Sequence, residues 1–283
     1  MKKFISKLYK FSSSWTGTFI IVLFLIFFVV QSFVIPSGSM KRTMQIGDFL
    51  FAKKFSYGIP LPMLPWIGKR IIPDFNHNGH LIEGDKPKRE DIVIFLYPKD
   101  KKTHFVKRCV ATGGDEILYV DKHLYIHFSE GDEYIKKNYP ANKIRKIRGK
   151  LWVDNPYMDK YPGIQYAPKK GTAFLYLAER VQYGAEIDMH PTYVEELGRR
   201  AFQTKTGKLV NAFYKKVEKD HYYMMGDNRD NSNDSRFWGS VPYSLVIGKP
   251  WFIYFSWDNE KKTVRWDRVG TFVDDLQLEK PRY

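Results

Sequence analysis

The segment Asp91–Val110, with the sequence DIVIFLYPKDKKTHFVKRCV, decides the fold class of this chain. Its first part, Ile92–Leu96, is a continuous apolar run with the length and composition of a buried strand. Side chains alternate in character along Thr103–Val110, which predicts a second strand after the intervening turn. The two segments together indicate a β-rich protein with a sheet at its centre.

Two adjacent cations, Lys107 and Arg108, lie in the second of these strands. Neighbouring residues of a strand point to opposite faces, so Lys107 shares a face with Phe105 and Cys109. If both faces are covered and this one is turned inward, Lys107 is buried among apolar groups. Burial can lower the pKa of a lysine by several units, which would make it a base near neutral pH. Periodicity alone also permits an edge strand with both cations in solvent.

Segments on both sides extend the β pattern. Phe49–Phe55 and Ile117–Val120 each predict a strand, and Tyr222–Trp257 is a series of apolar and aromatic segments separated by turns. Gly58–Lys88 is interrupted by prolines, so we expect an extended loop or an irregular hairpin there.

Residues 121–218 differ in character, with dense charges, frequent turns and short strands. Apolar residues spaced for one helical face predict a helix over Pro191–Phe202. We therefore expect a mostly β core formed by residues 36–120 and 219–283, with a smaller α+β domain inserted at 121–218.

The N-terminus has the pattern of a membrane anchor. Residues 1–14 contain Lys2, Lys3, Lys7 and Lys10, and residues 15–35 are predominantly apolar and carry no charge. About 20 such residues suffice for a helix to cross a bilayer. The lysines favour a cytoplasmic N-terminus, which would place the remaining chain outside. A cleaved signal peptide is the alternative, because small residues follow the apolar run.

The net charge narrows the function classes only slightly. Lysine and arginine number 46 against 31 acidic residues, a formal charge of +15. Such an excess suits an anionic membrane surface or nucleic acid, and part of it would serve only solubility. A single cysteine, Cys109, excludes an internal disulfide.

Several familiar catalytic motifs are absent from the sequence: the phosphate-binding loop, the dinucleotide-binding loop, H-E-x-x-H and G-x-S-x-G. A serine, Ser39, instead follows a glycine in the turn Ile35–Met40, just past the apolar segment. A hydroxyl becomes a nucleophile when a neighbouring base removes its proton, and a neutral lysine can be that base. A polar loop, Gly226–Arg236, is rich in Asp, Asn and Ser; by itself it is typical of a surface turn or a cation-binding loop.

Three boxes together resemble bacterial type I signal peptidases in order and spacing: Ile35–Met40, Lys107–Arg108 followed by Gly113–Asp115, and Gly226–Arg236. Further matches are Asp48 after Gly47, Lys54–Gly58, and Trp238-Gly239 before Val241-Pro242. The resemblance covers both ends of the predicted core and fades across residues 121–218, where that family carries a variable second domain.

The resemblance implies a Ser/Lys endopeptidase that removes signal peptides from exported preproteins. It implies Ser39 as nucleophile, Lys107 as general base, Ser37 as an oxyanion-hole residue, and Ser232 as the residue that orients the lysine. It implies that Asp234 with Arg236, and Asp227 with Arg108, support the site as ion pairs. Apolar pockets for the residues one and three before the cut are implied for Phe33, Ile35, Met40, Met44, Phe105 and Val106.

The same resemblance implies no metal and no cofactor. The expected partners are signal peptides and the phospholipid bilayer, with no nucleic acid. The expected location is the cytoplasmic membrane, with one transmembrane helix and the catalytic domain on the outer side.

The sequence departs from the usual family pattern at several positions. Arg42 stands where proline is common, Met44 where leucine is common, and Glu90 where glycine is common. Two rival interpretations remain: a relative dedicated to one substrate, such as a pilus or conjugation component, and a non-catalytic, membrane-tethered basic binding protein.

Overall fold

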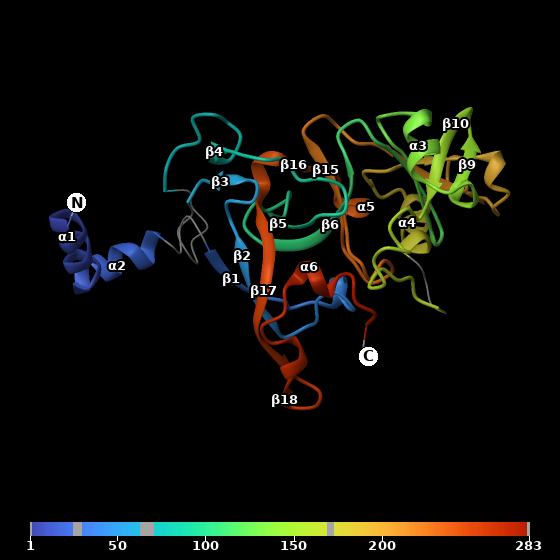
Figure 1. The fold of residues 1–283 in the computed structure, drawn as a ribbon. Coiled ribbons are helices and arrows are strands. Elements are labelled where there is room, and N and C mark those ends of the chain that lie inside the picture. Colours follow the sequence, from blue (N-terminus) through green and yellow to red (C-terminus); the bar gives the residue numbers. More distant parts are fainter. Residues whose placement is uncertain (1, 25–29, 63–70, 169–172, 282–283) are drawn as a thin grey trace.

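The structure, a computed structural model, describes residues 2–24, 30–62, 71–168 and 173–281. These residues form a mostly β protein with two principal sheets, as the sequence predicts, and the sheets occupy different parts of the molecule (Figure 1).

The first sheet is antiparallel and has eight strands. They are β1 (Val30–Val34), β2 (Asp48–Lys53), β17 (Val246–Asp258), β5 (Ile92–Leu96), β6 (His104–Thr112), β15 (His221–Met225) and β16 (Val241–Pro242), in spatial order, with β18 (Thr263–Val264) paired to β17. β17 changes register at three places, which lets this long strand pair with β2 along one part and with β5 along another. Gly248 allows a close crossing there, since an added Cβ would lie 2.3 Å from the carbonyl oxygen of Lys53.

The two predicted central strands pair with each other as β5 and β6, with Val93 opposite Lys107. Along β6, Cys109 packs into the core of the first sheet and Val110 into the core of the second. The neighbouring β15 alternates in the same way, with Met224 in the first core and Met225 in the second. Both faces of this strand pair are therefore covered.

The second sheet is also antiparallel and has six strands. They are β11 (His190–Thr192), β14 (Ala212–Lys216), β7 (Glu116–Val120), β8 (His123–His127), β10 (Lys150–Asp154) and β9 (Ile144–Ile147). Two small hairpins pair β3 (Gly58–Pro60) with β4 (His80–Glu83), and β12 (Phe202–Gln203) with β13 (Leu209–Val210).

Short helices connect or cover these sheets. The α-helices are α1 (Lys2–Ser12), α2 (Trp15–Phe24), α3 (Asp132–Asn138), α4 (Ala173–Gln182), α5 (Ser235–Trp238) and α6 (Val273–Leu276). The 3-10 helices are η2 (Gly38–Met40), η3 (Ala141–Lys143), η4 (Glu195–Leu197), η5 (Tyr243–Leu245) and η6 (Trp266–Arg268).

The helix predicted over Pro191–Phe202 is wrong. This segment instead contains part of β11, the single turn η4 and the first residue of β12. Val194 is buried against the second sheet, and its backbone N–H donates to the side chain of Asn211. Pairing of β11 with β14 satisfies backbone groups that a helix would have bonded internally.

The helix predicted over residues 15–35 is wrong at its C-terminal end. α2 ends at Phe24, residues 25–29 lie outside the described part, and Val30–Val34 form β1. β1 pairs antiparallel with β2, so backbone groups of these residues bond across the sheet. Within the part of the chain that the structure describes, no helix combines the length and apolarity needed to cross a membrane.

Candidate active site

Ser39 lies in η2, immediately after the chain leaves β1. The loop 226–236 holds this turn from the other side: the N–H of Asn228 donates to the Ser39 carbonyl at 3.0 Å, and its side-chain amide donates to the Gly38 carbonyl at 3.0 Å. Ser39 itself is only 8% exposed. Main-chain bonds therefore fix the serine independently of its hydroxyl, which stays available for another partner.

That partner is Lys107 on β6. Its Nζ lies 2.8 Å from Ser39 Oγ and 2.9 Å from the Val106 carbonyl oxygen. The lysine is 4% exposed and forms no ion pair with any residue that the structure describes. Burial lowers the pKa of Lys107 to about 8, against a weaker opposing effect of the Asp234 and Asp227 carboxylates. A substantial fraction of Lys107 is thus neutral near physiological pH, in contact with the serine hydroxyl.

Ser37 supplies a second hydroxyl beside the first. The two Oγ atoms of Ser37 and Ser39 are 3.4 Å apart, and the Ser37 backbone is extended, with φ −130° and ψ 155°. A donor in this position can reach a negative charge that develops next to Ser39 Oγ.

Ser232 lies near the lysine in the fold but makes no hydrogen bond to it. Its Oγ is buried and has no hydrogen-bond partner among the described residues, although it is close enough to Asp234 to help lower the pKa of that carboxylate. Gly226 packs tightly here: an added Cβ would lie 2.3 Å from Ser232 Oγ and 2.5 Å from the Ser39 carbonyl oxygen. A larger residue at position 226 would displace the backbone of the serine.

Two buried ion pairs hold the loop 226–236. Arg236 contacts both carboxylate oxygens of Asp234 at 2.8 Å, and Arg108 contacts both oxygens of Asp227 at 2.8 Å. All four side chains are fully buried. Burial alone would raise the pKa of each aspartate, but the neighbouring guanidinium groups hold both below the usual value. Two parallel contacts between a guanidinium and a carboxylate fix the geometry of each pair. The two pairs therefore hold the loop 226–236 in place.

A third buried ion pair, between Asp48 and Arg268, escaped the sequence analysis, which noted only the aspartate. Arg268 contacts the two oxygens of Asp48 at 3.0 and 2.6 Å and donates to the Thr43 carbonyl at 3.1 Å. The pair thereby fixes the turn that follows η2. No sequence signal identified Arg268, since its partner is 220 residues away.

Two of the noted departures occupy unusual backbone conformations. Glu90 has φ +80° and Arg42 has φ +81°, values that glycine adopts without strain and proline cannot reach. The side chain of Glu90 contacts Lys160 Nζ at 2.5 Å and the Tyr161 hydroxyl at 2.6 Å, which offsets the strain at that position.

Ser39 and Lys107 face a cleft of about 890 Å³. Apolar side chains that line it include five of the six predicted pocket residues: Phe33, Ile35, Met40, Phe105 and Val106. The sixth, Met44, is fully buried in the first core and is not on the cleft wall. The rest of the wall includes residues of α4 and residues 230–233; the resemblance implies Ser232 of this loop but no residue of α4.

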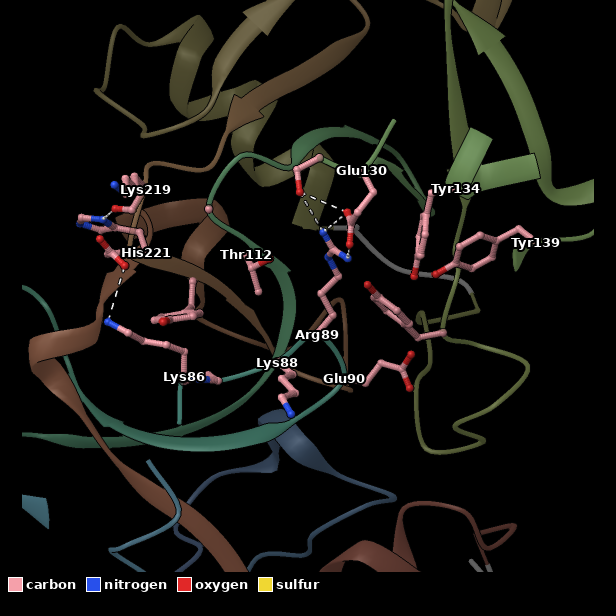
Figure 2. A pocket seen from close by; sticks show the side chains of 16 residues that line it. Lys86, Lys88, Arg89, Glu90, Thr112, Glu130, Tyr134, Tyr139, Lys219 and His221 are labelled. Carbon is pink, nitrogen blue, oxygen red and sulfur yellow. Dashed lines mark hydrogen bonds and ion pairs between the residues drawn. The ribbon is translucent and has the colours of Figure 1, made fainter. Parts of the chain in front are cut away.

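A second cavity, of about 630 Å³, lies where Lys86–Glu90 meet the second sheet (Figure 2). Arg89 points into it and is bonded to Glu130 and, at 2.6 Å, to Asp115. Its lining contains neither Ser39 nor Lys107. Ser39 and Lys107 therefore belong to the cleft and not to this cavity.

Comparisons with known proteins identify the family of this chain. The profile of the family "Signal peptidase, peptidase S26" matches residues 8–257. The chain is similar to a signal peptidase I of Helicobacter pylori strain J99, at 45% identity over 97% of this chain and 96% of that protein. A signal peptidase I of Pseudomonas fluorescens is 33% identical over 93% of this chain and 78% of its own length.

A crystal structure of a signal peptidase I from Enterococcus faecalis V583 matches 58% of this chain and 97% of its own, at 22% identity. Its TM-score of 0.26 is too low to bear on the fold. The family profile and the nearly full-length relatives decide the matter: this chain belongs to the signal peptidase family, peptidase S26.

Proposed function

We propose that this member of the family removes signal peptides from exported preproteins, with Ser39 as nucleophile and Lys107 as general base. The observation that carries the proposal is the 2.8 Å contact between Lys107 Nζ and Ser39 Oγ, made by a buried lysine whose pKa is lowered to about 8. A lysine in this state can accept the serine proton near neutral pH.

The reaction would proceed by acyl transfer. Neutral Lys107 takes the proton of Ser39 as Oγ attacks the scissile carbonyl carbon. The Ser37 hydroxyl and the Ser39 backbone N–H donate to the resulting oxyanion. The C–N bond breaks, and Lys107 returns the proton to the departing amine. Lys107 then deprotonates a water molecule that hydrolyses the acyl-enzyme and restores Ser39.

In this proposal the two ion pairs and Ser232 position the reacting groups. Asp227–Arg108 and Asp234–Arg236 fix the loop whose Asn228 bonds to the serine turn. Ser232 would orient Lys107, a role that requires a small movement from the arrangement in the structure, where the two are not bonded.

The apolar end of the cleft would receive the residues before the cut. Phe33 of β1 and Ile35, just after it, line this part of the cleft together with Phe105 and Val106 of β6. A signal peptide extended between these two segments would gain main-chain hydrogen bonds, with alternate side chains directed into the pockets. Narrow apolar pockets admit alanine, glycine or serine and exclude larger side chains by steric clash.

We also propose that the N-terminal segment anchors the protein in the cytoplasmic membrane, with residues 1–14 inside and the cleft outside. Apolar side chains project from α2 on several sides, including Trp15 at 95% exposure and Phe19 at 63%. A helix that is apolar all round favours lipid over water. The lysines of residues 1–14 favour the inner side.

The test is cleavage of a preprotein by the purified protein in detergent, with Ser39→Ala as the matched inactive control. A peptide library varied at the positions one and three before the cut should be cleaved after small residues only. Efficient cleavage after Phe, Lys or Glu would contradict the pocket assignment. Full activity of Ser39→Ala would remove the proposed nucleophile.

The topology has a separate test in intact spheroplasts. Protease added outside should digest the domain that carries Ser39 and leave residues 1–14 protected. A mature chain that begins near Met40 would instead support a cleaved signal peptide and would be incompatible with a retained Ser39.

A further inference from the structure

The wall of the cleft formed by α4 carries a charge that the proposed reaction does not use. Tyr176 and Arg180 of α4 line the same cleft as Ser39. α4 lies to the right of β6 in the view, whereas β1, which carries Phe33, lies to its left (Figure 1). The cleft therefore has lining residues from β1, β6 and α4, and in this view β6 lies between the other two elements.

α4 is tied to the loop that holds Ser39. Asp230, which lies between the two ion-paired aspartates of that loop, accepts a hydrogen bond from the N–H of Ala173 at 2.9 Å and from the N–H of Ala167 at 2.7 Å. Ala173 is the first residue of α4. Tyr176 also packs edge-on against Phe237, with ring centroids 5.6 Å apart. The position of α4 relative to the site is therefore fixed by contacts with the loop that follows Gly226.

Arg180 has no acidic partner among the residues that the structure describes. It forms no ion pair within the described ranges of the chain. Its Nε is buried without a hydrogen-bond partner there, and its one hydrogen bond runs from Nη2 to the Glu186 carbonyl at 3.4 Å. The guanidinium lies 5.9 Å from the ring centroid of Tyr176, one helical turn earlier. A guanidinium is always charged and has several donors in one plane, so it would readily bind a carboxylate.

We propose that Arg180, placed by Tyr176, forms a subsite for the residues that follow the scissile bond and favours an acidic side chain near the start of the released chain. This inference rests on the proposed function, because it assumes a peptide bound across Ser39. If the apolar end of the cleft receives the residues before the cut, the chain beyond Ser39 continues toward the α4 wall. There the unpaired cation attracts aspartate or glutamate and repels lysine.

The experiment uses the full-length protein in detergent and peptides that share one small-x-small sequence before the cut. The second and third positions after the cut carry Glu, Gln or Lys. The ratio of kcat/KM for the Glu and Lys peptides is measured at low and high salt for the wild type, Arg180→Gln and Arg180→Lys. Arg145→Gln is the matched control, since Arg145 is an exposed arginine of β9 whose side chain, among the described residues, donates only to the carbonyl of its neighbour Ile144.

The wild type should prefer the Glu peptide about fivefold, a size typical of a partly exposed ion pair, and the preference should shrink in high salt. Arg180→Gln should abolish the preference, whereas Arg180→Lys should retain part of it. Arg145→Gln should behave like the wild type. An unchanged ratio in Arg180→Gln, or no preference in the wild type, would overturn the subsite. Failure of every protein on every peptide, including the Gln series, would instead reject the proposed function.

Discussion

Two neighbouring residues of β6, one on each face of the strand, have opposite electrostatic surroundings. Lys107 and Arg108 are adjacent, both are cationic, and both are buried, at 4% and 0% exposure. Arg108 meets the Asp227 carboxylate through two 2.8 Å contacts, and its charge is retained. Lys107 meets a serine hydroxyl and a backbone carbonyl, and no carboxylate lies within ion-pair distance among the described residues.

The pKa values of the two side chains move in opposite directions as a result. Burial lowers the pKa of Lys107 to about 8. Burial would lower that of Arg108 too, but Asp227 more than compensates and raises it. A buried lysine without a carboxylate partner is partly neutral and can act as a base. A buried arginine paired with a carboxylate keeps its charge and stabilises the fold. Variants of Lys107, Arg108 and Ser232 test whether the two buried cations differ in this way.

Replacing Lys107 by Met should lower kcat/KM about 10⁴-fold, because the base is lost while the shape of the side chain is nearly kept. The free energy of unfolding at pH 7 should stay equal or rise by about 1–3 kcal/mol, since a desolvated amine is removed. Peptide cleavage and urea denaturation measure the two quantities. A marked loss of stability would show that Lys107 is a structural residue like its neighbour.

Replacing Arg108 by Met should lower stability, in contrast to the replacement of Lys107. It leaves the buried Asp227 carboxylate unpaired, so the free energy of unfolding should fall by about 3–5 kcal/mol. Adding Asp227→Leu should recover part of that loss, because the stranded charge is removed. If the double variant is no more stable than Arg108→Met alone, the two residues do not act as a pair.

The pH dependence of cleavage should report Lys107 and not Arg108. Cleavage requires the neutral amine, so kcat/KM should rise about tenfold per pH unit below pH 8 and level off above it. The folded pKa lies below the unfolded value of 10.5, so the unfolded chain binds the proton more tightly between pH 8 and 10.5. The stability contributed by this group should therefore increase with pH across that window, by about 3 kcal/mol in total.

Lys107→Met isolates that contribution, since the variant should lack this increase in stability while all other groups titrate as before. An unchanged pH profile of stability in the variant would assign the titration to another residue.

Replacing Ser232 by Ala should have the smallest effect, about a tenfold loss in kcat/KM and little change in stability. Its hydroxyl forms no hydrogen bond to Lys107 in the structure and lies close to the Asp234 carboxylate, so we expect it to help orient Lys107 only during the reaction. The apparent pKa of the rate profile should shift slightly while the plateau falls. A loss as large as that of Lys107→Met would make Ser232 a reacting group.

The sequence predicted β5 and β6 well because their hydrophobic periodicity is local. The sequence predicts the burial of Lys107 only if both faces of β6 are covered by other parts of the chain. The covering residues come from distant segments such as Met224 and Met225 of β15. The pairing of Asp227 with Arg108, which lies 119 residues away, was predicted only from the resemblance to the family.

The failures have the same physical cause. Val30–Val34, with the sequence VQSFV, continues the apolar segment of residues 15–35, and its place in a strand is decided by pairing with β2. Pro191–Phe202 has helical spacing, yet β11 gains a partner in β14. Met44 lies in the core of the first sheet and is not among the residues that line the cleft, a placement that local sequence cannot show.

The placement of β17 sets the order of events during synthesis. This strand lies between β2 and β5, and its Ser256 bonds to Asp48, 208 residues earlier. The first sheet therefore cannot close until almost the whole chain has been made, and pairing over such separations is slow. Ser39 follows β1 and Lys107 lies on β6, so the sheet that carries both is closed only when β17 has entered between β2 and β5. Under the proposed function, proteolytic competence would begin when the last long strand enters the sheet.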